Sequence, residues 1–300
     1  MPPFHQRFSL RDRRALAQLE ASRDFKFLKR LPRPDEVWCR SMPLPESGST
    51  TTVAIVDCET TGTDASRHKL IELAMVRMVI DDTRGDLVDI RPPVAWLEDP
   101  GEPLTQEIEA LTGLTDADLA GRSFDEHVIA DAFADVDVVV AHHASFDAGF
   151  VRTRFPSIGH PWACSMSEVD WLVHGLTGGK SLGALVTSAG YFADQAHRAA
   201  ADAWATAILL ALPARDGRCI AAHLIEQAQR VSHRVYATKA PFSAKDTLKS
   251  ASYRWSHTRR AWWREGDSES IANECGWLRT LHPAIVPVTD EIDWYTRHNR

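Results

Sequence analysis

Four acidic residues and one histidine fall in three short clusters. Asp57 and Glu59 lie two positions apart in Val-Asp-Cys-Glu-Thr-Thr-Gly, Asp147 ends the segment Ala-His-His-Ala-Ser-Phe-Asp, and His197 precedes Asp202 by five positions. Carboxylates bind hard divalent cations, and an imidazole can accept a proton from water near neutral pH. Together these groups suit metal-assisted hydrolysis of a phosphodiester. The clusters are far apart in sequence, so only a fold that joins the three segments could make them one site.

The first cluster places two carboxylates on one face of a strand. Side chains at positions i and i+2 of a strand point the same way, so Asp57 and Glu59 could hold one cation at the end of a strand. The spacing alone also fits a solvated strand end. The residues that follow, Thr60, Thr61 and Gly62, predict a tight polar turn that lets the backbone approach a ligand closely.

The second cluster follows the apolar run Val138–Val140 across a short polar link. This position places Asp147 between the end of a strand and the start of a helix, where an N-cap role is the alternative. His142 and His143 are adjacent in sequence, and adjacent side chains rarely face one ion. A transition-metal site built on the two histidines is therefore disfavoured.

The third cluster leads into an alanine-rich segment that is typical of a helix. Asp202 is expected to project from the first turns of this helix, with His197 at or before its start. Each residue taken singly also fits an ordinary surface position. That alternative weakens when all three clusters occur in order within one domain.

The surrounding pattern predicts one α/β domain over residues 51–213. Short β-branched or apolar runs favour strands, and longer periodic segments favour helices. The expected strands cover 51–57, 70–80 and 136–141, and the expected helices cover 100–119, a segment from 147 onward, 182–186 and 194–212, the last ended by Pro213.

Residues 51–213 resemble the DEDDh group of DnaQ-like 3′-to-5′ exonucleases, which contains the proofreading subunit of the bacterial replicative polymerase. The first, second and third exonuclease motifs are matched by residues 57–62, 141–147 and 197–202, and residues 71–74 and 111–115 resemble stretches between the first two. The likeness covers about half the chain. It implies a ribonuclease H-like mixed β-sheet flanked by helices.

The resemblance also implies roles. Asp57 would bridge two Mg²⁺ or Mn²⁺ ions about 3.5 to 4 Å apart, Glu59 and Asp202 would complete the site of the nucleophilic water, Asp147 would serve the second ion, and His197 would be the general base. Substrate binding would fall to Thr60, Thr61, Gly62, His143 and Phe146.

Two positions depart from the usual pattern of the family. Cys58 stands where a threonine or another small residue is common, and its side chain is expected to point away from the metals. His143 replaces the usual asparagine, which could alter how the site handles the terminal nucleotide. All five principal residues are present, so activity is expected.

The composition gives no global sign of nucleic-acid binding, since the formal net charge is -7. Five cysteines without a Cys-x-x-Cys pair argue against both a disulfide framework and a structural zinc site. No apolar run approaches the length of a membrane span. We therefore expect a cytoplasmic protein that does not bind membranes.

Two flanking regions complete the predicted organisation. Residues 1–50 suggest an amphipathic helix, with a capping box at Ser9 to Asp12, followed by a linker. Residues 214–300 suggest a helix and a small module that holds five of the ten tryptophans. Between Lys239 and Arg264 there are seven Lys or Arg residues and one acid, Asp246, interleaved with aromatic residues.

Basic and aromatic residues in this mixture are typical of surfaces that bind single-stranded nucleic acid or a partner. The alternative is a β-hairpin formed by Tyr253–Trp255 and Ala261–Arg264, with its aromatic rings in the core of the module and its charges in solvent. The two interpretations are compatible if they apply to opposite faces.

The sequence thus predicts an exonuclease that releases nucleoside 5′-monophosphates from 3′ ends of DNA, single-stranded or frayed. Two alternatives stay open. The same site would serve an exoribonuclease, since nothing in the motifs reads the 2′-hydroxyl. The chain could also be a subunit of a DNA polymerase or repair complex whose main role is binding, although intact catalytic residues argue against binding alone.

Overall fold

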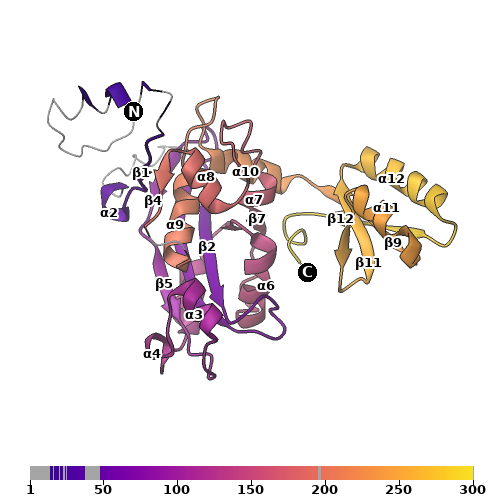
Figure 1. Cartoon of the computed structure of the whole chain (residues 1–300), viewed down its shortest axis with the longest axis horizontal. Helices are drawn as coiled ribbons and strands as arrows, with labels where there is room; N and C mark the ends of the chain where they lie inside the picture. The colour runs from indigo at the N-terminus through magenta and orange to yellow at the C-terminus, as the bar shows by residue number, and fades with distance from the viewer. Residues whose placement is uncertain are drawn as a thin grey trace.

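The computed structural model describes residues 14–15, 17–19, 21–22, 24, 26–37, 48–194 and 197–299. It contains two larger β-sheets, one for each of two packed units (Figure 1). The predicted capping box, and residues 40–47 of the linker predicted at 40–52, lie outside the described residues. The strands are β1 Lys29–Arg30, β2 Thr50–Thr60, β3 Leu70–Asp81, β4 Leu87–Ile90, β5 Val94–Leu97, β6 Val138–Ala141, β7 Trp162–Cys164, β8 Tyr191–Phe192, β9 Ser232–Thr238, β10 Arg254–Ser256, β11 Ala261–Gly266 and β12 Val286–Ile292.

Helices pack on both sheets. The helices are α2 Pro34–Val37, α3 Gln106–Thr112, α4 Asp116–Leu119, α5 Glu126–Phe133, α6 Ala144–Arg154, α7 Ser165–Glu168, α8 Leu182–Ser188, α9 Ala199–Leu210, α10 Ile220–Gln229, α11 Lys245–Ser250 and α12 Ser268–Leu281, with a 3₁₀ turn η1 at Phe242–Ala244.

The six-stranded sheet is mixed. Its order is β4-β3-β2-β6-β7, with β5 also paired to β3. Strand β2 runs antiparallel to β3 and parallel to β6, and β6 runs parallel to β7. The carboxyl ends of β2, β6 and β7 therefore meet at one edge of the sheet.

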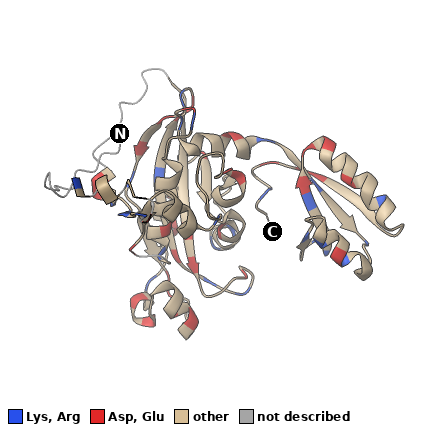
Figure 2. Cartoon of the chain, turned by 45° about the horizontal axis from the view of Figure 1, so that its top comes forward, with Lys and Arg blue, Asp and Glu red and all other residues tan. Residues whose placement is uncertain are grey.

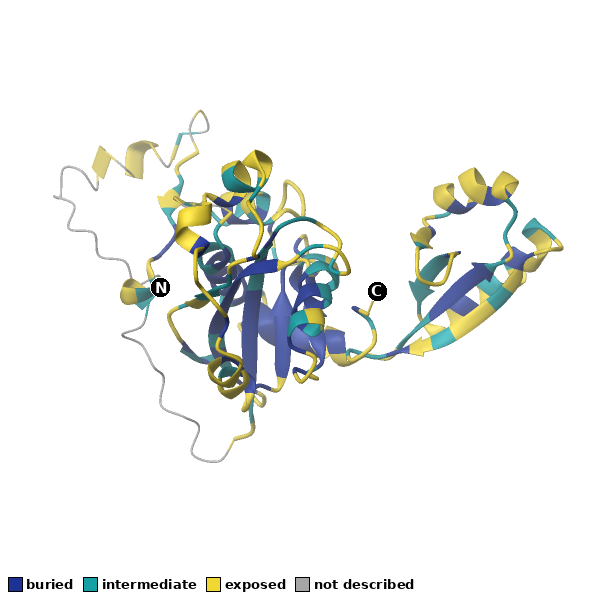
Figure 3. Cartoon of the chain, turned by 90° about the horizontal axis from the view of Figure 1, so that it is seen from below, coloured by how far each residue is buried: buried dark blue, intermediate teal, exposed yellow. Residues whose placement is uncertain are grey.

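Both faces of this sheet are buried (Figure 3). One face of β2, with Val53 and Ile55, packs against α8, α9 and α10. The other face, with Ala54 and Val56, packs against α5 and α6. The continuous β-branched run of β2 is explained by this two-sided burial. The predicted α/β class with a ribonuclease H-like mixed sheet is confirmed.

Three predicted helices differ in their bounds. Residues 100–119 hold two short helices, because Gly113 ends α3 with a left-handed φ of 69°. Helix α6 begins at Ala144, so Asp147 lies inside it and is not its N-cap. Helix α9 begins at Ala199, after His197 leaves the helical conformation with a φ of 64°.

The segment after Pro213 first returns to the six-stranded sheet. Ile220, Leu224 and Ile225 of α10 belong to the same hydrophobic core as α9. We infer that the two units divide after α10, near residues 230–231. At the other end of the chain, Leu31 is buried in this core, and the Trp204 indole donates a hydrogen bond of 2.6 Å to the carbonyl of Pro32.

The second unit is a four-stranded antiparallel sheet of order β10-β11-β9-β12. Strands β10 and β11 form the hairpin that the sequence offered as an alternative. One face carries Val235 and Ala237, and packs with Leu248 of α11 and with Ile271 and Leu278 of α12. No helix among the described residues packs on the other face.

The last residues of the chain join the two units. The Trp162 amide donates to the Trp294 carbonyl at 2.9 Å. The Arg297 guanidinium lies between Glu168 of α7 at 2.6 Å and Glu265 of β11 at 3.1 Å. His298 also contacts Glu168, at 3.0 Å. The buried ion pairs of Arg297 with Glu168 and Glu265 thus link residues 294–298, the C-terminal tail, to both units.

We expect Arg297→Ala to lower the free energy of unfolding by about 3 kcal/mol, because it leaves Glu168 buried without its cation. Urea unfolding followed by tryptophan fluorescence measures the change. Arg259→Ala, which breaks the more exposed Arg259–Asp290 pair, is the control and should cost about 1 kcal/mol or less. Equal losses in the two variants would contradict the buried link.

Candidate active site

Strand β2 carries two of the predicted site residues near its carboxyl end. Asp57 and Glu59 are half-buried and alternate with Cys58, which belongs to the core on the opposite face. Strand β3 pairs with this segment until a register shift between Glu59 and Thr60. The two carboxylates therefore share the face of the sheet on which α9 packs.

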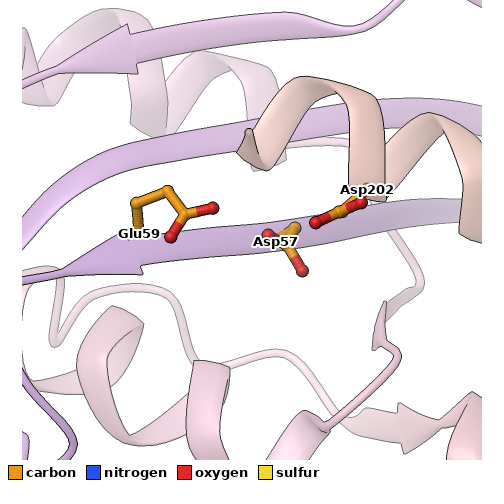
Figure 4. A group of neighbouring side chains, drawn as sticks. All are labelled: Asp57, Glu59 and Asp202. Carbon is orange, nitrogen blue, oxygen red and sulfur yellow. The ribbon is translucent and has the colours of Figure 1, made fainter. Parts of the chain in front are cut away.

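Helix α9 supplies a third carboxylate. Asp202 lies in its first turn, and contact with β2 and β3 fixes the position of the helix. Oxygen atoms of Asp57, Glu59 and Asp202 all lie within 4.8 Å of one another. Figure 4 shows the first two projecting from the strand and the third from the helix above it. Two of the three predicted clusters are thus brought together.

His197 stands just before α9, with an exposed side chain. Its left-handed φ of 64° is uncommon for a residue with a Cβ atom. The backbone N–H of His197 donates a hydrogen bond of 3.1 Å to Oδ2 of Asp202. This bond closes the turn and sets the histidine beside the carboxylates.

Asp147 approaches the same strand from the other face of the sheet. It is buried in α6 and interacts with the thiol and the backbone of Cys58. Its carboxylate is not part of the three-residue group within 4.8 Å, but its charge reaches Asp57. Cys58 faces away from Asp57 and Glu59, as expected, yet it is a direct neighbour of the fourth acid.

Glu72 is a residue of this site to which the sequence analysis gave no role. It pairs in register with Glu59 and is almost completely buried. Its carboxylate accepts hydrogen bonds from Arg198, at 3.3 Å from both Nε and Nη2, and from the Ala199 N–H at 3.4 Å. Glu72 is the one acid in the apolar run Leu70–Ile80, and this unusual position was the sequence feature that could have pointed to a role for it.

The turn after β2 is rigid. The Thr60 hydroxyl donates to the Gly62 carbonyl at 2.6 Å, and the Thr61 hydroxyl accepts from the Lys69 N–H at 2.9 Å. A Cβ atom on Gly62 would lie 2.4 Å from the ring of His68, so a close approach explains this glycine. Both threonine hydroxyls are engaged within the turn.

The two histidines that follow β6 differ in their burial and in their contacts. His142 is buried, and its ring nitrogens lie 2.8 Å from the Ser165 hydroxyl and 2.8 Å from the Lys180 carbonyl, so neither is available to a metal. His143 is exposed, and its ring stacks on Phe146 at a centroid distance of 6.2 Å. These two rings lie at the carboxyl edge of the sheet, close to the turn.

A model of the exonuclease family, of the RNase T type, matches residues 54–210, which hold most of the six-stranded sheet, the helices α5, α6, α8 and α9, and all the acids above. The chain belongs to this exonuclease family. Its DnaQ-like DEDD character follows from the four motif acids.

The similar proteins include DNA polymerases III of the PolC type. This chain is 43% identical over 107 residues to the PolC-type polymerase of Halalkalibacterium halodurans, a match covering 35% of this chain and 7% of the polymerase. The PolC-type polymerase of Listeria welshimeri is 33% identical over 165 residues. This match covers 53% of this chain and 11% of the polymerase. The match spans about a tenth of the length of these relatives.

Solved structures give weaker likenesses. Exonuclease X in complex with 5′ overhanging duplex DNA is 25% identical, with a TM-score of 0.40, covering 55% of this chain and 97% of that one. E. coli exonuclease I in complex with a dA16 oligonucleotide is 14% identical, with a TM-score of 0.47. The match covers 82% of this chain and 64% of exonuclease I.

The acids of this site repel one another. Burial, followed by the charges of Asp147 and Asp202, raises the pKa of Asp57 well above its usual value. Burial and the charge of Glu72 raise the pKa of Glu59 to about 8. Burial raises the pKa of Asp147 to about 7 and also raises that of Asp202, which the His197 N–H partly opposes. Ionised carboxylates at this spacing need a cation.

The donor set fits a hard divalent cation. Among the described residues, Asp57, Glu59 and Asp202 are the group that could hold a metal ion, and all three offer oxygen. Oxygen ligands favour Mg²⁺ or Mn²⁺ over softer metals. The described cysteines are free but contribute no thiolate to the group.

No helix in the described part of the chain is long and apolar enough to cross a membrane.

In the absence of metal, the free energy of unfolding should fall as pH rises from about 4.5 to about 8. Folded Glu59 keeps its proton in this range, whereas the unfolded chain has lost it, so the slope is about 1.4 kcal/mol per pH unit for this carboxyl. Urea titrations in EDTA at several pH values measure the slope. Glu59→Gln should flatten it, and saturating Mn²⁺ should raise stability most at the high end. A slope unchanged in Glu59→Gln would contradict the assignment.

Glu72→Ala should weaken Mn²⁺ binding by about 10- to 100-fold, because Arg198 and the Ala199 amide lose the carboxylate that holds the start of α9. Calorimetric titration with Mn²⁺ measures the change. Glu98→Ala is the matched control, since it breaks a partly buried ion pair with Arg154 away from the acids. The idea fails if both variants bind Mn²⁺ as the unchanged chain does.

Proposed function

We propose that the chain is a metal-dependent 3′-to-5′ exonuclease that hydrolyses phosphodiester bonds from the 3′ end of DNA and releases nucleoside 5′-monophosphates. The observation that carries the proposal is the convergence of Asp57, Glu59 and Asp202 within 4.8 Å of one another, in a chain of the exonuclease family. The sequence similarity to DNA polymerases supports DNA as the substrate.

The acids would act as metal ligands. Asp57 would be shared by two ions, Glu59 and Asp202 would hold the ion nearest the attacking water, and Asp147 would serve the second ion from the opposite face of the sheet. When bound, two Mg²⁺ or Mn²⁺ ions lower the pKa of water and neutralise charge on the phosphoryl and leaving oxygens.

His197 would accept the proton of the attacking water. Its side chain is exposed, and its backbone N–H donates to Asp202. A base that receives this proton must be able to reach water and then release the proton to solvent. The turn of Thr60, Thr61 and Gly62 on one side, with His143 and Phe146 on the other, would position the terminal nucleotide.

An exoribonuclease stays the second candidate, because metal ions held by the acids would act on a phosphodiester that DNA and RNA share. A role as a subunit of a polymerase or repair complex is compatible with exonuclease activity, since the relatives are polymerases.

We propose a cytoplasmic location. The five cysteines form no Cys-x-x-Cys pair and argue against a disulfide framework, as expected of a protein in a reducing compartment.

DNA and RNA oligomers labelled at the 3′ or 5′ end, incubated with Mg²⁺, Mn²⁺ or EDTA, test the proposal. Loss of the 3′ label at once, stepwise shortening of the 5′-labelled strand and no reaction in EDTA are expected. Internal cutting, or activity in EDTA, would refute it.

His197→Ala should lower kcat by about 10²- to 10⁴-fold while DNA affinity changes little, because only proton transfer is lost. Asp57→Ala should abolish metal-dependent activity altogether. Steady-state kinetics and fluorescence anisotropy measure the two effects. His127→Ala and Glu107→Ala remove an exposed histidine and an exposed acid elsewhere and should leave kcat unchanged. Near-normal rates in both site variants would rule out the assigned roles.

A further inference from the structure

A large cleft separates the carboxyl edge of the six-stranded sheet from the small sheet. Its volume is about 2230 Å³. On the exonuclease side it is lined by His143 and Ser145, which follow β6, and by Met166, which follows β7. On the other side it is lined by β9, the β10–β11 hairpin and the end of β12. Figure 1 shows the two units on either side of the chain's C-terminus.

One end of this cleft lies beside the proposed active site. Strand β6 is next to β2 in the sheet, with Ile55 paired to Val140. Strand β6 ends at Ala141, one residue past this pair, so His143 follows the strand next to the one that carries Asp57 and Glu59. A strand of nucleic acid whose 3′ end reaches Asp57 therefore meets the cleft next.

The far wall is the helix-free face of the small sheet. Arg254 pairs with Trp263, and Trp263 pairs with Tyr236, so these three side chains lie in one row on one face. The next residue of β11, Trp262, packs on the core under α11 and α12. The aromatic residues of the hairpin thus divide between the two faces: Trp262 packs on the core, and Trp263 lies on the opposite face.

Arginine side chains lie against the aromatic rings of this face. The Arg234 and Arg254 guanidinium carbons lie 4.5 and 5.8 Å from the ring centroid of Trp263, and that of Arg259 lies 4.9 Å from the centroid of Tyr236. We call these five residues the arginine–aromatic face.

The arginines of this face differ in their charge partners. Arg234 pairs with Glu265, and Arg259 pairs with Asp290. Arg254 is exposed, and within the described part of the chain no carboxylate lies within ion-pair distance of it. The same holds for Arg230, which also lines the cleft. These two cations are available for phosphates (Figure 2 shows the charges along the ribbon).

We propose that the cleft holds the single strand of nucleic acid that lies 5′ of the nucleotide being removed. Trp263 would stack on a base, while Arg254 and Arg230 would contact phosphates. A single strand is required because base faces are free to stack only when they are unpaired. The proposal rests on the proposed exonuclease function and adds a binding path of several nucleotides.

The test compares substrate lengths with the full chain. Oligothymidylates of about three and about 20 nucleotides are chosen because single-strand sites commonly span several nucleotides. Variants Trp263→Ala and Arg254→Ala should lower kcat/KM about tenfold on the long oligomer and leave it unchanged on the short one. Phe242→Ala and Arg279→Ala, an exposed ring and an exposed cation outside the cleft, should match the unchanged chain on both.

Binding of the long oligomer in EDTA, measured by anisotropy against salt, gives a readout that needs no catalysis. Removing Arg254 should reduce the logarithmic salt slope by about 0.7. An oligouridylate of equal length shows whether the cleft favours DNA or accepts both sugars. Arg254 is exposed, so its variant keeps the fold even if Trp263→Ala does not.

Equal kcat/KM in all variants on the long oligomer, or an unchanged salt slope, would overturn the cleft proposal. If the unchanged chain cleaves neither oligomer, the exonuclease function fails instead. In that event the salt slope in EDTA still decides whether the cleft binds the strand.

Discussion

Electrostatic repulsion among buried acids is the constraint on which the rest of the structure depends. Asp57, Glu59 and Asp202 stand within 4.8 Å of one another, and Asp147 lies behind the same strand. Left alone, such groups would move apart or take up protons. Their positions are set by packing instead. Nine of the twelve residues of α9 are buried, and this apolar contact with the sheet holds Asp202 over β2.

One further acid makes that packing specific. Glu72 adds negative charge beside Glu59, which is unfavourable electrostatically, but it also binds Arg198 and the Ala199 amide at the start of α9. The amide groups of a helix start lack partners within the helix, and a carboxylate suits them. Glu72 thus fixes the helix end from which His197 and Asp202 extend. Its cost in repulsion is offset when a cation binds the neighbouring acids.

Local patterns predicted part of this site, and long-range pairing determined the rest. The alternation of β2 was enough to place Asp57 and Glu59 on one face, and the alanine-rich segment was enough to place Asp202 in a first helical turn. The role of Glu72 depends on its register with Glu59 across two strands, which sequence does not give. The late start of α9 follows from the left-handed backbone of His197, a conformation that residue type does not predict. Adjacent residues of a strand always point to opposite faces, but packing decided that Trp262, and not Trp263, faces the core.

The tail and the arginine–aromatic face belong to one network. Glu265 accepts hydrogen bonds from Arg234, which stacks on Trp263, and from Arg297, which also binds Glu168 beside the end of β7. Because these charges are largely buried, each arginine is held in place by partners that it cannot exchange for water cheaply. The orientation of Trp263 is therefore tied, through two arginines and two acids, to the edge of the sheet that carries the proposed active site. A cleft whose walls are joined in this way keeps a fixed path between the stacking surface and the acids, which a flexible linker alone would not provide.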